Sequence, residues 1–553
     1  MAKEVVGFLH SQGRKMVNGA GEEVILSGWG AGNWMNPEGF MVSGVQMGLG
    51  DPDAMRLKKL SVNRRFDRRR TINEGIRELC GSDYARSFWK KWFRAHLAED
   101  DIREMSRWGY NSVRLPLDAS ALLHEEPGIH FNEDSFQMLE DLIDLCEKYR
   151  VYAIFDLHGT PGHSGVACDN GLDNIPRLFL EPETRERMLI LWEQITKRFK
   201  DRWIVGAYEL LNEPLFPAWR DLKDQLASFY DDTIARIRKI DKNHMIILSG
   251  PLVGTDTSIF TRSFDPECEN WAYTFHGYHI LPDPAGFQKY LECSRKMNIP
   301  AWHGEGRAPL KGMASYYDML AENHVGYNMF CWKSEGVSGM ENSPVTHGMP
   351  KDWNKITTYL FDGGPRPSYA EAQKIFDEYL EKIRFVNCEV NTDMFRYSLR
   401  KPGIELPGVC YDSFGGEGIS FSGGCAIGNP LNFRLIDRTK LVVGDGIELP
   451  VNFGPGRGPA SDPMEILWLR LDAGDYACYS VRDIQDQCVV AVKLKADSGT
   501  VLSISCGEKE KEFPVPAGVS ESRMLTLSTA EKAVVKLRVI TGSACIIRVA
   551  FQE

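Results

Sequence analysis

From about residue 98 onward, the sequence alternates between two patterns of hydrophobic and polar positions. Short apolar runs, such as Ser112–Leu117 and Val205–Leu211, are typical of strands that are buried on both faces. Between them lie longer segments in which apolar residues recur every three or four positions, as in Asp134–Tyr149. This second spacing predicts amphipathic helices whose apolar faces cover a sheet.

Eight strands are predicted when the early run Val24–Ser27 is included. The other seven runs are Ser112–Leu117, Val151–Leu157, Val205–Leu211, Met245–Ser249, Trp271–Phe275, Pro300–His303 and Gly326–Phe330. Strands that alternate with helices form a parallel sheet, and eight of them close most naturally into a cylinder. The pattern therefore predicts an α/β fold of the (β/α)8 TIM-barrel type.

Two segments depart from this alternation. Residues 42–100 carry helical patterns, including Thr71–Cys80 and Asp83–His96, and are predicted to be a helical insertion over the mouth of the barrel. After about residue 385, short apolar runs are separated by Gly and Pro, which predicts an all-β sandwich or jelly roll. We therefore expect a barrel domain of residues 1–385 and a β-sandwich accessory domain of residues 386–553.

Composition narrows the classes of partner and compartment. With 65 Lys and Arg against 76 Asp and Glu, the net charge of −11 argues against a nucleic-acid or acidic-membrane surface and favours small neutral ligands. No apolar run is long enough for a membrane span, and the first residues lack the apolar centre of a signal peptide. The thirteen cysteines form no CxxC pair. We expect a cytoplasmic protein, or a secreted one whose signal peptide has been removed; the oligomeric state is not predicted.

Polar residues gather where six of the predicted strands end, which in a TIM barrel is where catalytic residues lie. They include Arg114, Asp156, His158, Asn212, Glu213, His276, Tyr278, His303, Glu305 and Trp332. An isolated polar residue at a strand end more often serves structure than catalysis. Agreement among six strands favours an active site.

Two carboxylates follow strands on opposite sides of the predicted barrel, Glu213 after the fourth and Glu305 after the seventh. A facing pair of carboxyl groups suits glycoside hydrolysis, in which one group protonates the leaving oxygen while the other attacks the anomeric carbon. We expect Arg114 to keep Glu305 anionic and Tyr278 to hold it by a hydrogen bond. Glu305 is then the nucleophile and Glu213 the acid/base, with Asn212 placed to grip a sugar hydroxyl. The scheme needs no metal or cofactor.

The segment Gly32–Phe40, directly behind the first strand, combines aromatic and hydrogen-bonding residues. Trp34 offers a plane for the CH face of a sugar and Glu38 an acceptor for its hydroxyls. Packing at the barrel rim is the alternative, and the sequence leaves the two open.

Six motifs together resemble glycoside hydrolase family 5, in the clan whose catalytic glutamates follow strands 4 and 7. They are Asn212-Glu213-Pro214, Gly304-Glu305-Gly306, Ser112-Val113-Arg114-Leu115-Pro116, Asp156-Leu157-His158-Gly159, His276-Gly277-Tyr278 and Cys331-Trp332-Lys333. The resemblance implies that Glu213 is the acid/base and Glu305 the nucleophile. It also implies a −1 subsite shaped by Arg114, His158, Asn212, His276 and Tyr278, with Trp332 as an aromatic platform.

Finer features of the resemblance point to a mode of cleavage. The Gly32–Phe40 segment and Asp156–Gly162 are similar to the exo-acting members, so we expect a pocket that removes terminal sugars from oligosaccharides or glycosides. An endo-acting glucanase or mannanase and a non-catalytic carbohydrate-binding protein are the alternatives. Residues 468–481 resemble a strand pair of family 6 carbohydrate-binding modules, although packing between domains is the preferred role of this module.

Overall fold

The computed structural model describes residues 5–43, 66, 68–165, 175–278, 284–336, 343–423, 433–447 and 463–553. The chain divides into two compact units. The first consists of Met1–Gly277, Lys289–Gly306 and His324–Val390, and the second of Tyr278–Gln288, Arg307–Asn323 and Asn391–Glu553. Residues 278–288 and 307–323 fall in the second compact unit, and the predicted division into residues 1–385 and 386–553 stays a prediction.

The first unit holds the predicted barrel, which is confirmed. Its eight strands are parallel and close in the order β10-β3-β4-β5-β6-β7-β8-β9. They span Ser27–Gly30 (β3), Ser112–Asp118 (β4), Tyr152–Gly159 (β5), Val205–Glu209 (β6), Met245–Ser249 (β7), Trp271–Gly277 (β8), Ala301–Gly306 (β9) and Gly326–Phe330 (β10). Every residue of these strands is buried, as expected for a sheet covered on its outer face and filled inside.

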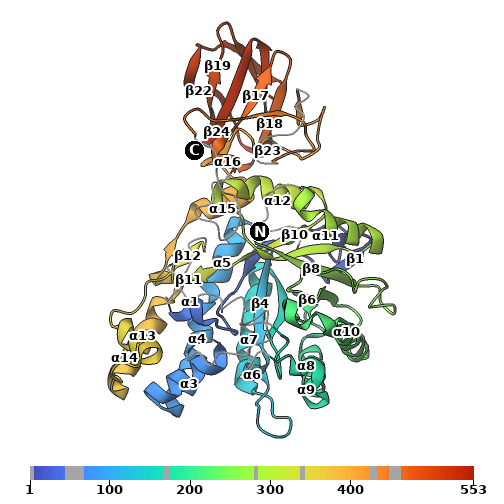
Figure 1. Cartoon of the computed structure of the whole chain (residues 1–553), viewed down its shortest axis with the longest axis vertical. Helices are drawn as coiled ribbons and strands as arrows, with labels where there is room; N and C mark the ends of the chain where they lie inside the picture. The colour runs from blue at the N-terminus through green and yellow to red at the C-terminus, as the bar shows by residue number, and fades with distance from the viewer. Residues whose placement is uncertain are drawn as a thin grey trace. The chain divides into compact units, whose positions relative to one another are not determined.

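Helices surround the barrel strands (Figure 1). Those of the first unit include α5 (Glu99–Trp108), α6 (Ala119–Leu122), α7 (Glu133–Tyr149), α8 (Arg177–Leu180), α9 (Pro182–Phe199), α10 (Lys223–Arg238), α13 (Trp353–Asp362) and α14 (Tyr369–Lys382). In the sequence, α11 (Pro284–Met297) follows β8 and is divided between the two units, and α12 (Met313–Glu322) follows β9 and belongs to the second unit. In α7, Phe136, Leu139 and Ile143 recur at helical spacing and are fully buried, so this face covers the sheet. A hairpin of β1 (His10–Gln12) and β2 (Lys15–Val17) precedes β3, and the short strands β11 (Lys333–Ser334), β12 (Val345–Thr346) and β13 (Glu389–Val390) form a small separate sheet.

The predicted insertion between β3 and β4 is helical where it is described. It contains α1 (Gly39–Ser43), α3 (Arg69–Cys80) and α4 (Ser82–His96), while residues 44–65 and 67 lie outside the described residues. Arg70 of α3 donates to Glu125, in the loop that follows β4 and α6, at 2.6 Å. In Figure 1, α3 lies at the same end of the barrel as α6, which directly follows β4. The described part of the insertion is therefore attached at the carboxyl end of the strands.

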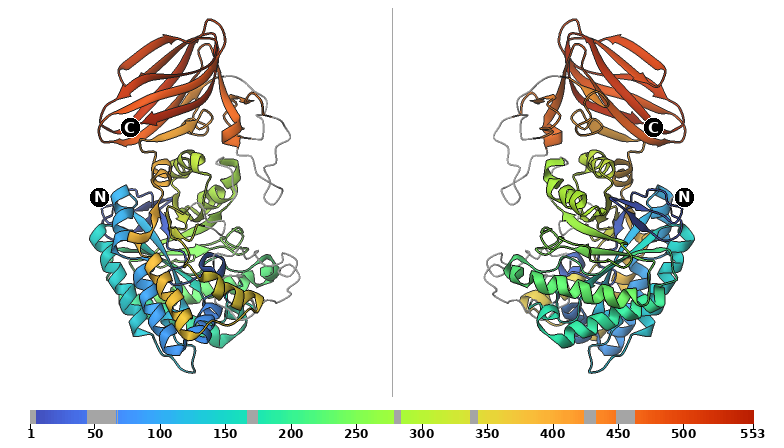
Figure 2. Two further views of the ribbon diagram at one scale, coloured as in Figure 1. Left: turned by 90° about the vertical axis from the view of Figure 1, so that its left-hand side faces the viewer. Right: turned by 90° about the vertical axis from the view of Figure 1, so that its right-hand side faces the viewer.

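The second unit contains two antiparallel sheets, as the prediction of an all-β domain requires (Figure 2). One has the order β16-β17-β24-β19-β22, with β14 paired to β24, and the other β15-β18-β23-β20-β21. The strands are β14 (Ile404–Pro407), β15 (Phe421–Ser422), β16 (Lys440–Val443), β17 (Leu467–Asp472), β18 (Tyr476–Ile484), β19 (Cys488–Ala496), β20 (Val501–Cys506), β21 (Lys509–Pro514), β22 (Gly518–Leu527), β23 (Ala530–Thr541) and β24 (Ser543–Gln552). The helices α15 (Thr392–Leu399) and α16 (Pro463–Ile466) precede β14 and β17. Along β23, Ala533, Val535, Leu537 and Val539 are buried at alternate positions and form part of the core.

A buried arginine ties helix α12 to the β domain within this second unit. The guanidinium of Arg400, at the end of α15, contacts the carboxylates of Asp318 in α12 and of Asp412 at 2.7 Å each. It also donates to the carbonyls of Ala314 and Ser480. The neighbouring carboxylates outweigh the effect of burial and raise the pKa of Arg400 above its ordinary value, so it stays charged.

Replacing Arg400 with methionine is expected to destabilise this unit by about 3 kcal/mol, because it leaves two largely buried carboxylates without their cation. The matched control is Lys401→Ala, which removes a more exposed ion pair with Asp483 and should cost less than about 1 kcal/mol. Urea unfolding of the full chain, followed by circular dichroism, checks both. Equal midpoints for the two variants would contradict the role given to Arg400.

Candidate active site

Arg114 lies at the centre of the polar cluster inside the barrel. It is the third residue of β4 and is fully buried. Its Nε and Nη2 donate to the two carboxylate oxygens of Glu209 at 2.7 and 2.9 Å, and its Nη1 donates to Oε2 of Glu305 at 2.7 Å. Nη2 also donates to Oδ1 of Asn212 at 2.8 Å and lies 3.0 Å from Oδ2 of Asp156. One guanidinium therefore joins residues from four elements of the barrel.

Glu213 and Glu305 both lie near His276, the sixth residue of β8. Nδ1 of His276 lies 2.6 Å from Oε1 of Glu213 and 4.0 Å from Oε2 of Glu305. One oxygen of each carboxyl group and a nitrogen of His276 all lie within 4.8 Å of one another. Both carboxylates disfavour loss of the imidazolium proton and, against the effect of burial, raise the pKa of His276. The structure thus brings together the two glutamates that the sequence singled out.

His158 and Asn212 form a second layer beside Arg114. Nδ1 of His158 faces Oδ2 of Asp156 at 2.9 Å, and Nε2 lies 3.0 Å from Nδ2 of Asn212. Although burial disfavours the charged ring, Asp156 raises the pKa of His158 to about 9. Because Arg114 donates to Oδ1 of Asn212, the amide of Asn212 presents its N–H to Nε2 of His158. This amide orientation pairs with an unprotonated Nε2, so the charged ring that the raised pKa favours would require the Asn212 amide to turn away.

Glu213 has a strained backbone. Its φ is 36°, in the left-handed region that non-glycine residues seldom adopt, and Leu215 follows with φ 62°. Such a conformation costs on the order of 1 kcal/mol and is found most often where function fixes a side chain. Leu215 is held by a hydrogen bond from its amide to the carbonyl of Ser164. The turn after β6 therefore holds the Glu213 carboxyl group at the carboxyl end of the strand.

Two further predicted residues, Glu38 and Trp34, lie in different surroundings. Glu38 is brought near the cluster, with Oε1 3.9 Å from Nε2 of His158. Trp34 is 1% exposed and its indole donates to the carbonyl of Phe93 in α4. These contacts are those of the packing alternative that the sequence left open for Trp34, and its contact with a sugar stays a prediction.

Trp332 and Tyr278 follow β10 and β8. Nε1 of Trp332 donates to Oδ1 of Asp101 at 2.8 Å, and its ring packs edge-on against Trp29 at 6.1 Å. Trp332 is buried, so its role as a sugar platform stays a prediction. Tyr278 is half-buried directly after β8, and the predicted hydrogen bond from Tyr278 to Glu305 also stays a prediction.

Comparison with known proteins finds a family model that matches part of the chain. Residues 75–336 match the family model described as cellulase, glycosyl hydrolase family 5. This segment contains β4 to β10 and both glutamates of the cluster. Over these residues the chain is similar to glycoside hydrolase family 5.

Relatives of this chain carry several names. A β-xylosidase of Phanerodontia chrysosporium is 27% identical over 288 residues, which cover 52% of this chain and 55% of the relative. Cellodextrinase A of Ruminococcus flavefaciens is 32% identical over 187 residues, covering 33% and 52%. Among solved structures, a β-mannanase from Thermomonospora fusca aligns with 67% of this chain and 99% of its own, at 14% identity and a TM-score of 0.41. The chain spans about half the length of these two curated relatives.

Two acidic residues of the Arg114 cluster were not among the site residues predicted from the sequence. Glu209 stands inside an apolar strand, and Asp156 was noted only as a polar residue at a strand end. A charged residue at an inward position of a buried strand is the signal that could have identified Glu209. Burial raises the pKa of the Glu209 carboxyl to about 7, Arg114 opposes this effect, and Asp156 adds to it.

The atoms of Glu213, His276 and Glu305 also have a spacing that could accommodate a metal ion, the one such group found within the described ranges. Glycoside hydrolysis by two carboxyl groups requires none, and the expectation of a metal-independent site stays a prediction.

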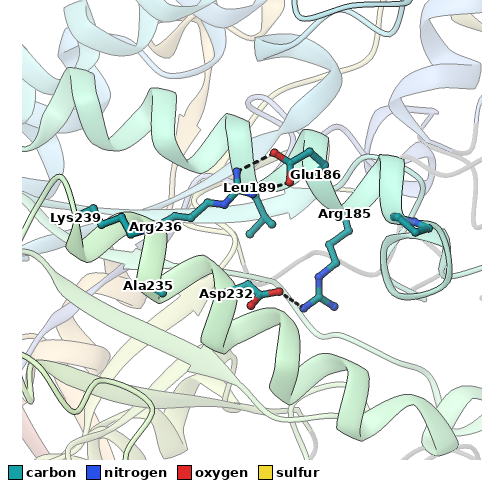
Figure 3. Close-up of a pocket in the computed structure, with 8 residues that line it drawn as sticks. Arg185, Glu186, Leu189, Asp232, Ala235, Arg236 and Lys239 are labelled. Atoms are coloured by element: carbon teal, nitrogen blue, oxygen red, sulfur yellow. Dashed lines mark hydrogen bonds and ion pairs between the residues drawn. The ribbon is translucent and has the colours of Figure 1, made fainter.

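A depression of about 420 Å³ lies between α9 and α10 (Figure 3). Its charged residues pair across the two helices, Arg185 with Asp232 and Arg236 with Glu186, at 2.6 Å each. None of the predicted site residues lines it.

No helix within the described residues is both long and apolar enough to cross a membrane.

Proposed function

We propose that this chain is a retaining glycoside hydrolase that acts on oligosaccharides or glycosides, with Glu305 as nucleophile and Glu213 as acid/base. The observation that carries the proposal is the closeness of the two carboxyl groups, whose facing oxygens lie within 4.8 Å. Retaining glycosidases hold their carboxyl groups about 5–5.5 Å apart, whereas inverting enzymes need about 6.5–9.5 Å to admit a water molecule between sugar and base.

In the first step, a carboxylate oxygen of Glu305 bonds to the anomeric carbon while protonated Glu213 gives its proton to the departing glycosidic oxygen. The products are an alcohol and a glycosyl ester on Glu305. In the second step, ionised Glu213 takes a proton from water as the water oxygen attacks the anomeric carbon and the ester bond breaks. The sugar leaves with its original configuration, and both carboxyl groups return to their starting states.

The surrounding residues support the roles of Glu305 as nucleophile and Glu213 as acid/base. Arg114 donates to Oε2 of Glu305 and favours its ionised form, which the attack requires. His276 contacts Glu213 at 2.6 Å, and a proton within this contact can be held by either partner. Glu213 therefore has a neighbour that can accommodate both its protonated and its ionised states.

We propose further that the enzyme removes terminal sugars. This proposal is supported by the sequence resemblance to exo-acting members and by the helical insertion attached at the carboxyl end of the barrel. The names β-xylosidase and cellodextrinase A belong to relatives. An endo-acting glucanase is the second candidate, because endoglucanase C of Acetivibrio thermocellus is also related, at 24% identity over 195 residues.

Two measurements test the proposed function. A panel of nitrophenyl glycosides, furanosides included, identifies a hydrolysed substrate, and proton NMR then follows the anomer that is released first. Retained configuration is expected, and an inverted first product would refute the double displacement. Digestion of oligosaccharides labelled at the reducing end should release monosaccharides from the other end, whereas internal cuts would favour the endo-acting alternative.

A further inference from the structure

Glu209 holds the Arg114 guanidinium from its side. Its two carboxylate oxygens accept from Nε and Nη2 of Arg114 at 2.7 and 2.9 Å, which is a bidentate contact along one edge of the guanidinium. This contact prevents the guanidinium plane from rotating. It directs Nη1 toward Oε2 of Glu305 and keeps Nη2 within 2.8 Å of Oδ1 of Asn212.

From this geometry we propose that Glu209 is a positioning residue of the hydrolytic site, acting through Arg114 on the nucleophile and on Asn212. The inference rests on the proposed function. Glu209 is the last residue of β6, four positions before Glu213, and it is fully buried. Its effect on the reaction is transmitted by the guanidinium and not by contact with the sugar.

The charges around Glu209 explain why its ionised form matters. Arg114 from β4 is the cation that faces it, Asp156 from β5 is a second anion, and His276 from β8 and Tyr230 from α10 are further titratable groups that interact with it. Arg114 thus meets three carboxylates, those of Asp156, Glu209 and Glu305. Removing the charge of Glu209 leaves the guanidinium shared between two carboxylates and removes one negative charge from the neighbourhood of Glu305.

Two substitutions separate the effect of the charge of Glu209 from the effect of the length of its side chain. Glu209→Gln keeps the size and one acceptor but loses the charge and the two-oxygen contact. We expect kcat on an aryl glycoside to fall roughly tenfold to a hundredfold, because a displaced Arg114 no longer fixes Glu305. The acid limb of the pH profile of kcat/KM should move to lower pH, since less negative charge surrounds Glu305. Glu209→Asp keeps the charge but is one methylene too short, so kcat should fall while the acid limb stays in place.

Tyr208→Phe is the matched control on the same strand. The Tyr208 hydroxyl donates to Asp241 at 3.1 Å and does not contact the cluster around Arg114. This variant should lower thermal stability without altering kcat per active site or the pH profile. The fraction of active sites is measured by mass spectrometry after trapping with a 2-deoxy-2-fluoroglycoside, so that misfolded protein is excluded from kcat.

The same trapping separates the inference from the proposed function. A wild-type enzyme that forms no adduct on Glu305 would refute the proposed mechanism before any variant is compared. If the wild type is trapped and Glu209→Gln keeps the wild-type kcat and acid limb, Glu209 has no positioning role. If Glu209→Gln does not fold, an unchanged kcat in Glu209→Asp overturns the inference, and a lowered kcat with an unmoved acid limb upholds it.

Discussion

Replacing Glu305 with alanine is expected to lower kcat for aryl glycosides by about 10⁴-fold or more, the scale seen when a group essential to covalent catalysis is removed. The reason is that alanine removes the carboxylate that forms the glycosyl ester in the first step. Added azide should restore part of the rate, because the small anion fits the space left by the carboxylate. Its product should be a glycosyl azide of inverted anomeric configuration, which NMR identifies.

Glu104→Ala is a suitable control, since it makes the same substitution in α5, where Glu104 pairs with Arg107. It should leave kcat unchanged. Full activity of Glu305→Ala, or a loss that azide cannot rescue in a folded protein, would exclude Glu305 as nucleophile. Thermal unfolding of both variants shows whether the fold is kept.

Glu213→Gln should have an effect that depends on the leaving group. For substrates with a poor leaving group, such as an alkyl or sugar alcohol, loss of the proton donor is expected to lower kcat by about 10²–10⁴-fold. For dinitrophenyl glycosides, which leave without protonation, the first step should persist. The second step loses its general base, so the glycosyl-enzyme should accumulate and give a burst of dinitrophenol.

Azide distinguishes this variant from the nucleophile variant. Attack on the intermediate of Glu213→Gln should yield a glycosyl azide with the configuration of the substrate, opposite to that expected for Glu305→Ala. An equal loss of activity with good and poor leaving groups would contradict the acid/base role. Glutamine is chosen because it keeps the shape of the side chain at a position with φ of 36°.

Much of the barrel could be predicted because the apolar composition of its strands is visible in the sequence itself. Buried parallel strands are apolar throughout, and the predicted Met245–Ser249 and Gly326–Phe330 match β7 and β10 in both bounds. The first strand was displaced, since Val24–Ser27 was predicted and β3 spans Ser27–Gly30. The residues before Ser27 are the more apolar, so the pattern predicted a strand there. Close packing against β4 decides instead which residues of this segment pair. At Gly28 an added Cβ would lie 1.9 Å from the carbonyl oxygen of Ser112 in β4.

The site could be predicted only in part. Motifs around Glu213, Glu305 and Arg114 identified residues that the structure brings together. Glu209 was missed because its partner Arg114 lies 95 residues away in the sequence, and only the pairing of β4 and β6 with β5 brings them together. For Trp34 and Trp332 the sequence gives the aromatic ring but not its direction, which depends on packing partners such as Phe93 and Asp101.

The assignment of α12 to the second unit affects where the chain can be shortened or recombined with a relative. This helix follows the strand that carries Glu305, yet it belongs to the same compact unit as the β domain, where Arg400 contacts Asp318. A chain shortened after Val390 would expose the face of α12 that packs on α15. Recombination between relatives at this apparent boundary would therefore join parts that did not evolve together, and an exchange that moves α12 with the β domain would preserve more of the native contacts.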